Sequence, residues 1–164
     1  MLLARPAWIS VDLGAIADNV RCLQRRLGPE TAILAIVKAH AYGHGAVPVA
    51  KTALAAGARM LGVTCLDEAL ELREAGITAD ILMLGYAPPW QASTIVANDI
   101  CATAYDPELL EPLATAAQAL GRVARVHLKV DTGMSRFGPL PDGVDRLVER
   151  ALGMPGLRIE GVFT

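Results

Sequence analysis

The stretch VKAHAYGHG at residues 37–45 decides the fold class and marks the candidate site. It overlaps the end of an apolar run, AILAIV at residues 32–37, whose length and branched residues predict a buried β-strand. Glycines at 43 and 45 then predict a turn, and a helix rich in alanine and valine is expected from Ala46. Lys38 therefore lies where a strand ends and a turn begins, which is the edge of βα folds at which sites form.

Two interpretations of Lys38 follow from its position. An amine held among apolar neighbours is disfavoured in its charged form and becomes a candidate nucleophile. A lysine that leaves a strand can also simply extend into solvent, and position alone favours this second interpretation. The choice between them depends on the residues elsewhere in the chain that share the same edge.

Composition and charge exclude several classes of protein. The 164 residues suffice for one domain with a core, which must be aliphatic because 53% of residues are hydrophobic and only 4% aromatic. The net charge of −2 and the lack of a basic tract argue against nucleic acid or an anionic membrane surface as a partner. No apolar stretch reaches the length of a membrane span, and Arg5 and Pro6 interrupt any signal-peptide core.

The cysteines indicate the compartment. Cys22, Cys65 and Cys101 are far apart, odd in number and set in apolar sequence. We interpret them as reduced thiols of the core, which predicts a cytoplasmic protein.

Strand and helix patterns alternate along the whole chain. Strands are expected at residues 7–12, 32–38, 60–64, 81–84, 100–103, 125–131 and 157–163, and helices at 13–27, 46–56, 66–75, 89–97, 107–120 and 142–152. Such alternation with short loops predicts an α/β protein with a parallel sheet. From residue 32 there are about six βα units, fewer than the eight that close a TIM-type barrel. The sequence also ends inside its last strand, so we expect a fragment of a longer protein.

The strand at residues 125–131 carries polar groups on one face. Side chains alternate along a strand, so His127, Lys129 and Asp131 should point inward while the apolar residues between them meet the helices. The glycine-bounded loop that follows presents Arg136, a planar donor suited to a carboxylate or phenolate oxygen. Lys38, Lys129 and Arg136 near one mouth require an anion, which could be a phosphate, a carboxylate or a modified lysine. Alternatively, Lys129 and Asp131 neutralise each other and Arg136 lies in solvent.

A metal site is the weaker hypothesis. His40 and His44 have the spacing of ligands on one helical face. Glycines at 43 and 45 argue against a helix there, and neither a nearby cysteine nor a clear acidic third ligand is present. We therefore expect no metal.

Taken together, two stretches resemble a known family. Residues 37–45 resemble the pyridoxal-phosphate attachment motif of alanine racemases, and VHLKVDTGMSRFG at residues 126–138 resembles their second signature. The resemblance runs from residue 7 to residue 164 and includes LDEALELREAG at 66–76 and EGVFT at 160–164. Two long motifs in the right order make it specific.

The resemblance implies a domain organisation. These fold-type III enzymes combine an eight-stranded (β/α)8 barrel with a β-rich C-terminal domain and act as homodimers. Residues 1–12 would be a leading strand that packs with the C-terminal β-domain, which is missing here. Residues 13–164 would be the partial barrel that binds pyridoxal phosphate.

The resemblance also implies roles for single residues. Lys38 would hold pyridoxal 5'-phosphate covalently and move the α-proton on the D side, and Tyr42 would hydrogen-bond the cofactor phosphate. Arg136 would reach the phenolic oxygen of the cofactor and seat the substrate carboxylate. Lys129 matches a lysine that family members carry as a carbamate, which would supply the required anion.

The implied activity is the interconversion of L-alanine and D-alanine, for the supply of peptidoglycan precursors. One alternative is a non-catalytic barrel that binds pyridoxal phosphate in cofactor homeostasis, but such proteins lack the spacing between Lys129 and Arg136. Another alternative is that this chain is a fragment with a purely structural role.

The sequence departs from the family at one position and lacks part of its machinery. His40 stands where these enzymes usually carry Asn or Asp, although histidine also tolerates a left-handed or turn conformation. The tyrosine base for the L side and the arginine that faces the pyridine nitrogen come from later sequence in the family. We therefore expect residues 1–164 alone to be inactive.

Overall fold

Six parallel strands form one sheet in the computed structural model, which describes residues 8–164. The strands are β1 (Leu34–Ile36), β2 (Met60–Val63), β3 (Asp80–Met83), β4 (Cys101–Ala104), β5 (Ala124–Lys129) and β6 (Leu157–Phe163). Their order in the sheet follows their order in the chain, and every neighbouring pair is parallel. A sheet wound in one direction without reversal is the arrangement of a barrel, whereas a doubly wound sheet reverses its strand order. The predicted incomplete barrel is confirmed.

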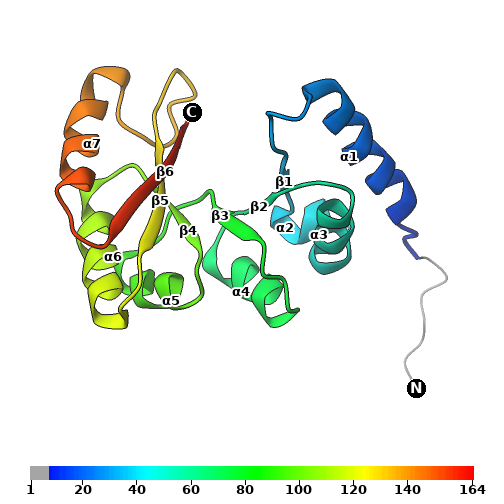
Figure 1. The fold of residues 1–164 in the computed structure, drawn as a ribbon, viewed down its shortest axis with the longest axis horizontal. Helices are drawn as coiled ribbons and strands as arrows, with labels where there is room; N and C mark the ends of the chain where they lie inside the picture. The colour runs from blue at the N-terminus through cyan, green and yellow to red at the C-terminus, as the bar shows by residue number, and fades with distance from the viewer. Residues whose placement is uncertain (1–7) are drawn as a thin grey trace.

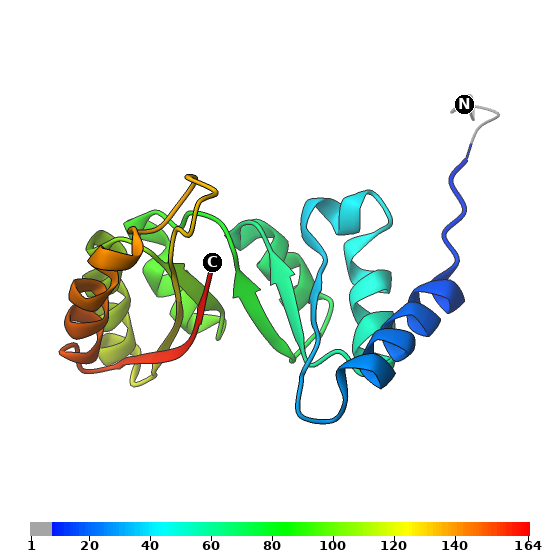
Figure 2. The same ribbon diagram turned by 90° about the horizontal axis from the view of Figure 1, so that it is seen from above.

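The helices surround the outside of this curved sheet (Figures 1 and 2). They are α1 (Leu13–Leu27), α2 (Lys38–Tyr42), α3 (Ala46–Ala55), α4 (Leu66–Glu74), α5 (Ala92–Ala97), α6 (Pro107–Leu120) and α7 (Val144–Leu152), with 3-10 turns η1 (Pro89–Gln91) and η2 (Pro141–Gly143). In the part of the chain that the structure describes, none of them is both long and apolar enough to cross a membrane.

Local sequence signals set the helix ends where we expected them. The Asp12 carboxylate accepts a hydrogen bond from the Ala15 amide and caps α1, and the Asp106 carboxylate accepts one from the Glu108 amide and caps α6. Gly121 ends α6 in a left-handed conformation with φ 60°. These signals determine where α1 begins and where α6 begins and ends.

An aliphatic core fills the space between the sheet and the helices. Leu61, Ile81 and Leu128 from the strands are fully buried, as are Ile95 and Leu110 from the helices that cover them. This confirms the composition of the core that the sequence predicts. The uniform burial of small and medium side chains also explains why so few aromatic residues are needed.

The cysteines only partly match the prediction. Cys101 is buried, and its burial raises the pKa of its thiol to about 12. Cys22 is half-buried and Cys65 is exposed, so the prediction of core thiols is wrong for Cys65. Cys65 is the residue immediately before α4, and its backbone, not its side chain, takes part in the structure there.

The segment before α1 does not form the expected strand within the described residues. Residues 8–12 are neither helix nor strand, and the side chains of Trp8 and Ile9 are largely exposed. Ala7 and the residues before it lie outside the described range. That residues 1–12 pack with a C-terminal β-domain remains a prediction.

Arg125 links several strands near their amino-terminal ends. Its side chain is only 9% exposed, and Nη1 donates to the Asp80 carboxylate at 2.5 Å, while Nη2 donates to the Asp99 carbonyl at 3.0 Å. Nη1 also lies 3.5 Å from the Glu160 carboxylate, and Nε lies 3.0 Å from the Asp99 carboxylate. One guanidinium thus joins β3, β5, β6 and the turn before β4, using the fork geometry that lysine lacks.

We expect Arg125→Met to lower the free energy of unfolding by about 1–3 kcal/mol, because it leaves three carboxylates without their shared cation. The free energy of unfolding of Arg125→Lys should lie between those of wild type and Arg125→Met, since one ammonium cannot reach both aspartates. Urea unfolding followed by circular dichroism measures the difference. Arg158→Met is the control, because Arg158 pairs with Glu160 at the surface and its loss should cost less than about 0.5 kcal/mol. Equal stability of Arg125→Met and wild type would contradict this role.

Candidate functional site

Lys38 and Lys129 lie at the same edge of the sheet. The Val37 amide donates to the Gly62 carbonyl at 2.8 Å, so the sheet ladder continues to the residue before Lys38. Lys129 is the last residue of β5, opposite Phe163 at the end of β6. Because all strands are parallel, both lysines belong to the carboxyl edge, as the sequence predicts.

The turn after Lys38 is left-handed. Ala39 (φ 50°, ψ 49°), His40 (φ 55°, ψ 44°) and Ala41 (φ 52°, ψ 47°) adopt left-handed helical angles, and Tyr42 also has a positive φ of 54°. Gly43 completes the turn with φ 85°. We predicted a glycine turn at this place, but most of the turn is made by residues with side chains.

Such a turn is strained, and its surroundings hold it in place. A left-handed conformation costs roughly 1–2 kcal/mol for each residue with a Cβ. The Ala41 amide donates to the Val37 carbonyl at 2.8 Å, and the Gly45 amide donates to the His40 carbonyl at 2.9 Å. Ala41 is also buried under the neighbouring elements. The strain therefore fixes the direction in which the chain leaves Lys38 and presents Tyr42, whose side chain is exposed.

The two histidines of this turn have separate partners. His40 Nδ1 lies 3.8 Å from the Glu71 carboxylate on α4, and His44 Nδ1 lies 2.9 Å from the Ala41 carbonyl oxygen. Because the turn is left-handed, the spacing of ligands on a right-handed helix does not apply to them.

Lys129 is buried, with only 4% of the residue exposed. Its Nζ lies 5.1 Å from the centre of the Phe163 ring. Among residues 8–164, no carboxylate oxygen lies within ion-pair distance of it. The burial of Lys129 agrees with an inward lysine, and its charge is one of the causes that lower the pKa of the Asp131 carboxyl. That Lys129 needs a further anion stays a prediction.

Asp131 instead organises the loop that carries Arg136. Its carboxylate accepts hydrogen bonds from the Ser135 and Gly133 amides, both at 2.9 Å. The bonds from Ser135 and then Gly133 hold the pKa of this carboxyl below its usual value. The aspartate is thus a loop residue of the kind that satisfies backbone amides.

The base of the same loop is closed tightly. The Asp131 amide donates to the Pro139 carbonyl at 2.9 Å, and Gly138 has φ 111°. A Cβ at Gly138 would lie 2.7 Å from the Lys129 carbonyl oxygen, so glycine is required there. The loop presents Arg136 to solvent, with its guanidinium carbon 5.8 Å from the centre of the Phe137 ring.

The site residues divide into two groups along this edge. Lys38 and Tyr42 follow β1, whereas Lys129 and Arg136 come from β5 and the loop after it. A pocket of about 230 Å³ lies at the ends of the intervening strands β3 and β4, lined by residues that include Tyr86, Thr103 and Tyr105. It contains none of the four predicted residues, and Tyr105 stacks on the neighbouring Phe137 with ring centres 5.1 Å apart.

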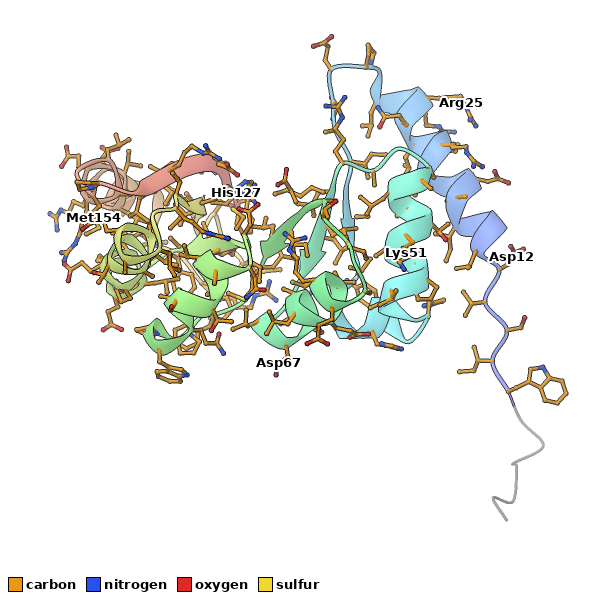
Figure 3. The ribbon with its side chains drawn as sticks, turned by 60° about the horizontal axis from the view of Figure 1, so that its bottom comes forward. Asp12, Arg25, Lys51, Asp67, His127 and Met154 are labelled. Atoms are coloured by element: carbon orange, nitrogen blue, oxygen red, sulfur yellow. The ribbon has the colours of Figure 1, made fainter. Side chains whose placement is uncertain are left out.

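A second polar cluster lies within the sheet, away from its carboxyl edge. Cys101, His127 and Glu160 come from β4, β5 and β6, and their ligand atoms lie within 4.8 Å of one another; Figure 3 labels His127 on β5. Burial lowers the pKa of His127, which disfavours the charged form of the imidazole. The Glu160 carboxylate already contacts two guanidinium groups, from Arg125 and Arg158, so the cluster holds cations of its own. We assign it a structural role.

Together the carboxyl edge offers a half-buried primary amine, a phenol, a guanidinium and a buried lysine. These groups suit a ligand with a carbonyl carbon, which an amine attacks, and with anionic oxygens. The sequence analysis named these four residues, and their roles stay predictions. It missed the left-handed turn and the contacts from α4 because neither leaves a local sequence signal.

We expect Ala39→Gly to leave the free energy of unfolding unchanged or to raise it by up to about 1 kcal/mol, because glycine relieves the strain of a positive φ. In a right-handed helix the same change has the opposite sign and costs up to about 1 kcal/mol. Ala119→Gly, at an exposed position of α6, supplies this comparison. The measurement is urea unfolding of both variants. An equal loss of stability in both would show that the turn is not strained.

Comparison with known proteins agrees with this geometry. Residues 11–164 match the family described as alanine racemase, N-terminal domain. The alanine racemase of Desulfovibrio desulfuricans is 46% identical over 160 residues, which are 98% of this chain and 43% of that protein. The solved alanine racemase of Bacillus anthracis with bound L-Ala-P superposes with a TM-score of 0.87 at 39% identity, covering 99% of this chain and 42% of that one. That of E. faecalis superposes with a TM-score of 0.88 at 39% identity, covering 94% and 42%. The chain thus spans less than half the length of these relatives, and it belongs to the alanine racemase N-terminal domain family.

Proposed function

We propose that this chain is the lysine-bearing part of a racemase that depends on pyridoxal 5'-phosphate and interconverts L-alanine and D-alanine. The observation that carries the proposal is Lys38, an amine at the end of β1 whose following turn is held in a strained left-handed conformation. The relatives of this chain are named alanine racemases, and the solved relative from Bacillus anthracis has L-Ala-P bound. The position of Lys38 and the membership of the family both support the proposal.

The residues at the carboxyl edge fit this cofactor. Pyridoxal phosphate carries an aldehyde, a phosphate and a phenolic oxygen. The Lys38 amine suits the aldehyde, the Tyr42 hydroxyl suits the phosphate, and the Arg136 guanidinium suits the phenolic oxygen or the substrate carboxylate. Lys129, buried without an acidic partner among the described residues, adds to the positive charge that favours such an anionic ligand.

When bound, the cofactor supplies an electron sink that stabilises the negative charge left at the α-carbon of the amino acid. Lys38 holds the cofactor in place and accepts or donates the α-proton on the D side through its Nζ. Arg136 orients the substrate carboxylate. A carbamate on Lys129 would turn a buried cation into an anion, which relieves the repulsion between Lys129 and Arg136.

The wider role follows from the same proposal. D-alanine would serve the supply of peptidoglycan precursors in the cytoplasm, and the complete enzyme would be a homodimer that uses alanine as its small-molecule partner. Residues 1–164 alone would be inactive, because the proton donor for the L side would come from outside this chain. The spacing between Lys129 and Arg136, which non-catalytic barrels that only carry the cofactor lack, favours a racemase.

Lys38 should be the residue that carries the cofactor. Incubation of the complete enzyme with pyridoxal phosphate, reduction with borohydride and peptide mapping by mass spectrometry should find the label on Lys38. Lys38→Ala should remove that label and lower the racemase rate by at least about a hundredfold, because a proton-transfer group is lost. Labelling of a different lysine with Lys38 unmodified would refute the assignment.

Lys129→Ala should lower the rate of racemisation, and added acetate or formate should restore part of it. The loss should be about tenfold or more, because the variant removes the lysine whose proposed carbamate is the anion that orients Arg136. Lys51→Ala on α3, which Figure 3 labels, is the control, since Lys51 is exposed and remote from the edge. Full activity of Lys129→Ala without acetate would mean that Lys129 has only a structural role.

A further inference from the structure

Glu68 on α4 joins two loops at the carboxyl edge. Its Oε1 accepts a hydrogen bond from the Ala39 amide at 2.7 Å, and its Oε2 accepts one from the Thr64 amide at 2.6 Å. Ala39 directly follows Lys38, and Thr64 directly follows β2. A single carboxylate therefore ties the start of the left-handed turn to the end of the neighbouring strand.

Both hydrogen bonds to the Glu68 carboxylate are charge-assisted. A carboxylate that accepts backbone amides forms charge-assisted hydrogen bonds, which are shorter and stronger than neutral ones. Both oxygens are used, each by an amide from a different loop, so the carboxylate cannot rotate without losing one of them. The position of Glu68 in the first turn of α4 also favours its negative charge.

The helix that carries Glu68 is itself firmly held. Leu66, Ala69 and Leu72 of α4 are buried in the core, so the Glu68 backbone has little freedom to follow the loops. One turn later, Glu71 faces the His40 side chain at 3.8 Å but contacts no backbone amide of the turn. Glu68 is thus the residue of α4 that acts on the backbone next to Lys38.

We propose that Glu68 is a positioning residue for Lys38. The left-handed turn is strained, and without an acceptor for the Ala39 amide the peptide between Lys38 and Ala39 can rotate toward a conformation of lower energy. Rotation of that peptide changes the direction of the Lys38 side chain. The clamp from Glu68 to Ala39 and Thr64 prevents this and keeps Nζ where the proton is transferred. The inference rests on the proposed role of Lys38.

Three variants of the complete enzyme test the clamp. Glu68→Gln keeps the size of the side chain but offers one acceptor oxygen in place of two, so one amide loses its partner. Glu68→Asp keeps the carboxylate on a stem that is shorter by one methylene. Asp67→Asn removes the same charge from the same turn of α4, at an exposed side chain that Figure 3 labels.

The first measurement is amide hydrogen exchange. Glu68→Gln should reduce the protection of the Ala39 or Thr64 amide by about tenfold, whereas the amide of Leu128 in β5 should exchange as in wild type. Asp67→Asn should match wild type at all three amides. Unchanged protection of both Ala39 and Thr64 in Glu68→Gln would overturn the clamp.

The second measurement separates positioning from a general loss of structure. Glu68→Gln should lower kcat by about tenfold to a hundredfold, with a change in KM for alanine of less than about threefold, because a misplaced Nζ affects the proton transfer more than substrate binding. Asp67→Asn should retain both constants. If Glu68→Gln also loosens Leu128, Glu68→Asp decides: kcat must recover together with Ala39 protection. A low kcat with full protection of both the Ala39 and the Thr64 amide would overturn the proposal.

Borohydride mapping of the wild type keeps this proposal separate from the proposed function. If wild type carries the cofactor on another lysine, the racemase assignment and this inference both fail. If wild type carries it on Lys38 and Glu68→Gln retains wild-type kcat, the positioning role alone fails.

Discussion

The parallel hydrogen-bond ladder is the constraint on which the rest of the structure depends. It extends past the strands into the first residue of several loops: the Val37 amide donates to Gly62, the Leu84 amide to Val63 and the Val130 amide to Phe163, at 2.8–2.9 Å. The next residue after Val37 is Lys38, and the next after Val130 is Asp131. The ladder therefore determines where both site segments begin, and the loops add only the direction in which they leave the sheet.

Much of this could be predicted from the sequence because it rests on short-range patterns. The strand at residues 157–163 coincides with β6, and the boundaries of the other expected strands from residue 32 onward differ from the structure by a few residues, whereas residues 8–12 form no strand. Alternation along residues 125–131 predicted that Val126 and Leu128 meet the helices while Lys129 points inward, and the burial of all three agrees. Helix caps such as Asp106 carry their own chemical signal.

The left-handed turn after Lys38 could not be predicted in the same way. Alanine is the residue that most favours a right-handed helix, yet Ala39 and Ala41 are left-handed here, because contacts distant in sequence determine their conformation. Competition between partners explains the other difference. Asp131 lies two residues from Lys129 and suggested an ion pair, but the amides of Gly133 and Ser135 are closer in the folded loop and take its carboxylate.

The energy of the turn shows where the site obtains its rigidity. Four consecutive residues with a Cβ and a positive φ cost on the order of 4–8 kcal/mol, which is comparable to the net stability of a whole domain. The strand β1 has three residues and cannot offset this by itself. The offset has to come from the elements beside it: from β2, which binds the Val37 amide, and from α4, whose Glu68 binds the Ala39 amide. His40 fits this account in spite of its departure from the family, because histidine tolerates the left-handed angles and its ring extends toward Glu71 on the same helix. The position of Lys38 is therefore a property of β2 and α4 as much as of the motif that contains it.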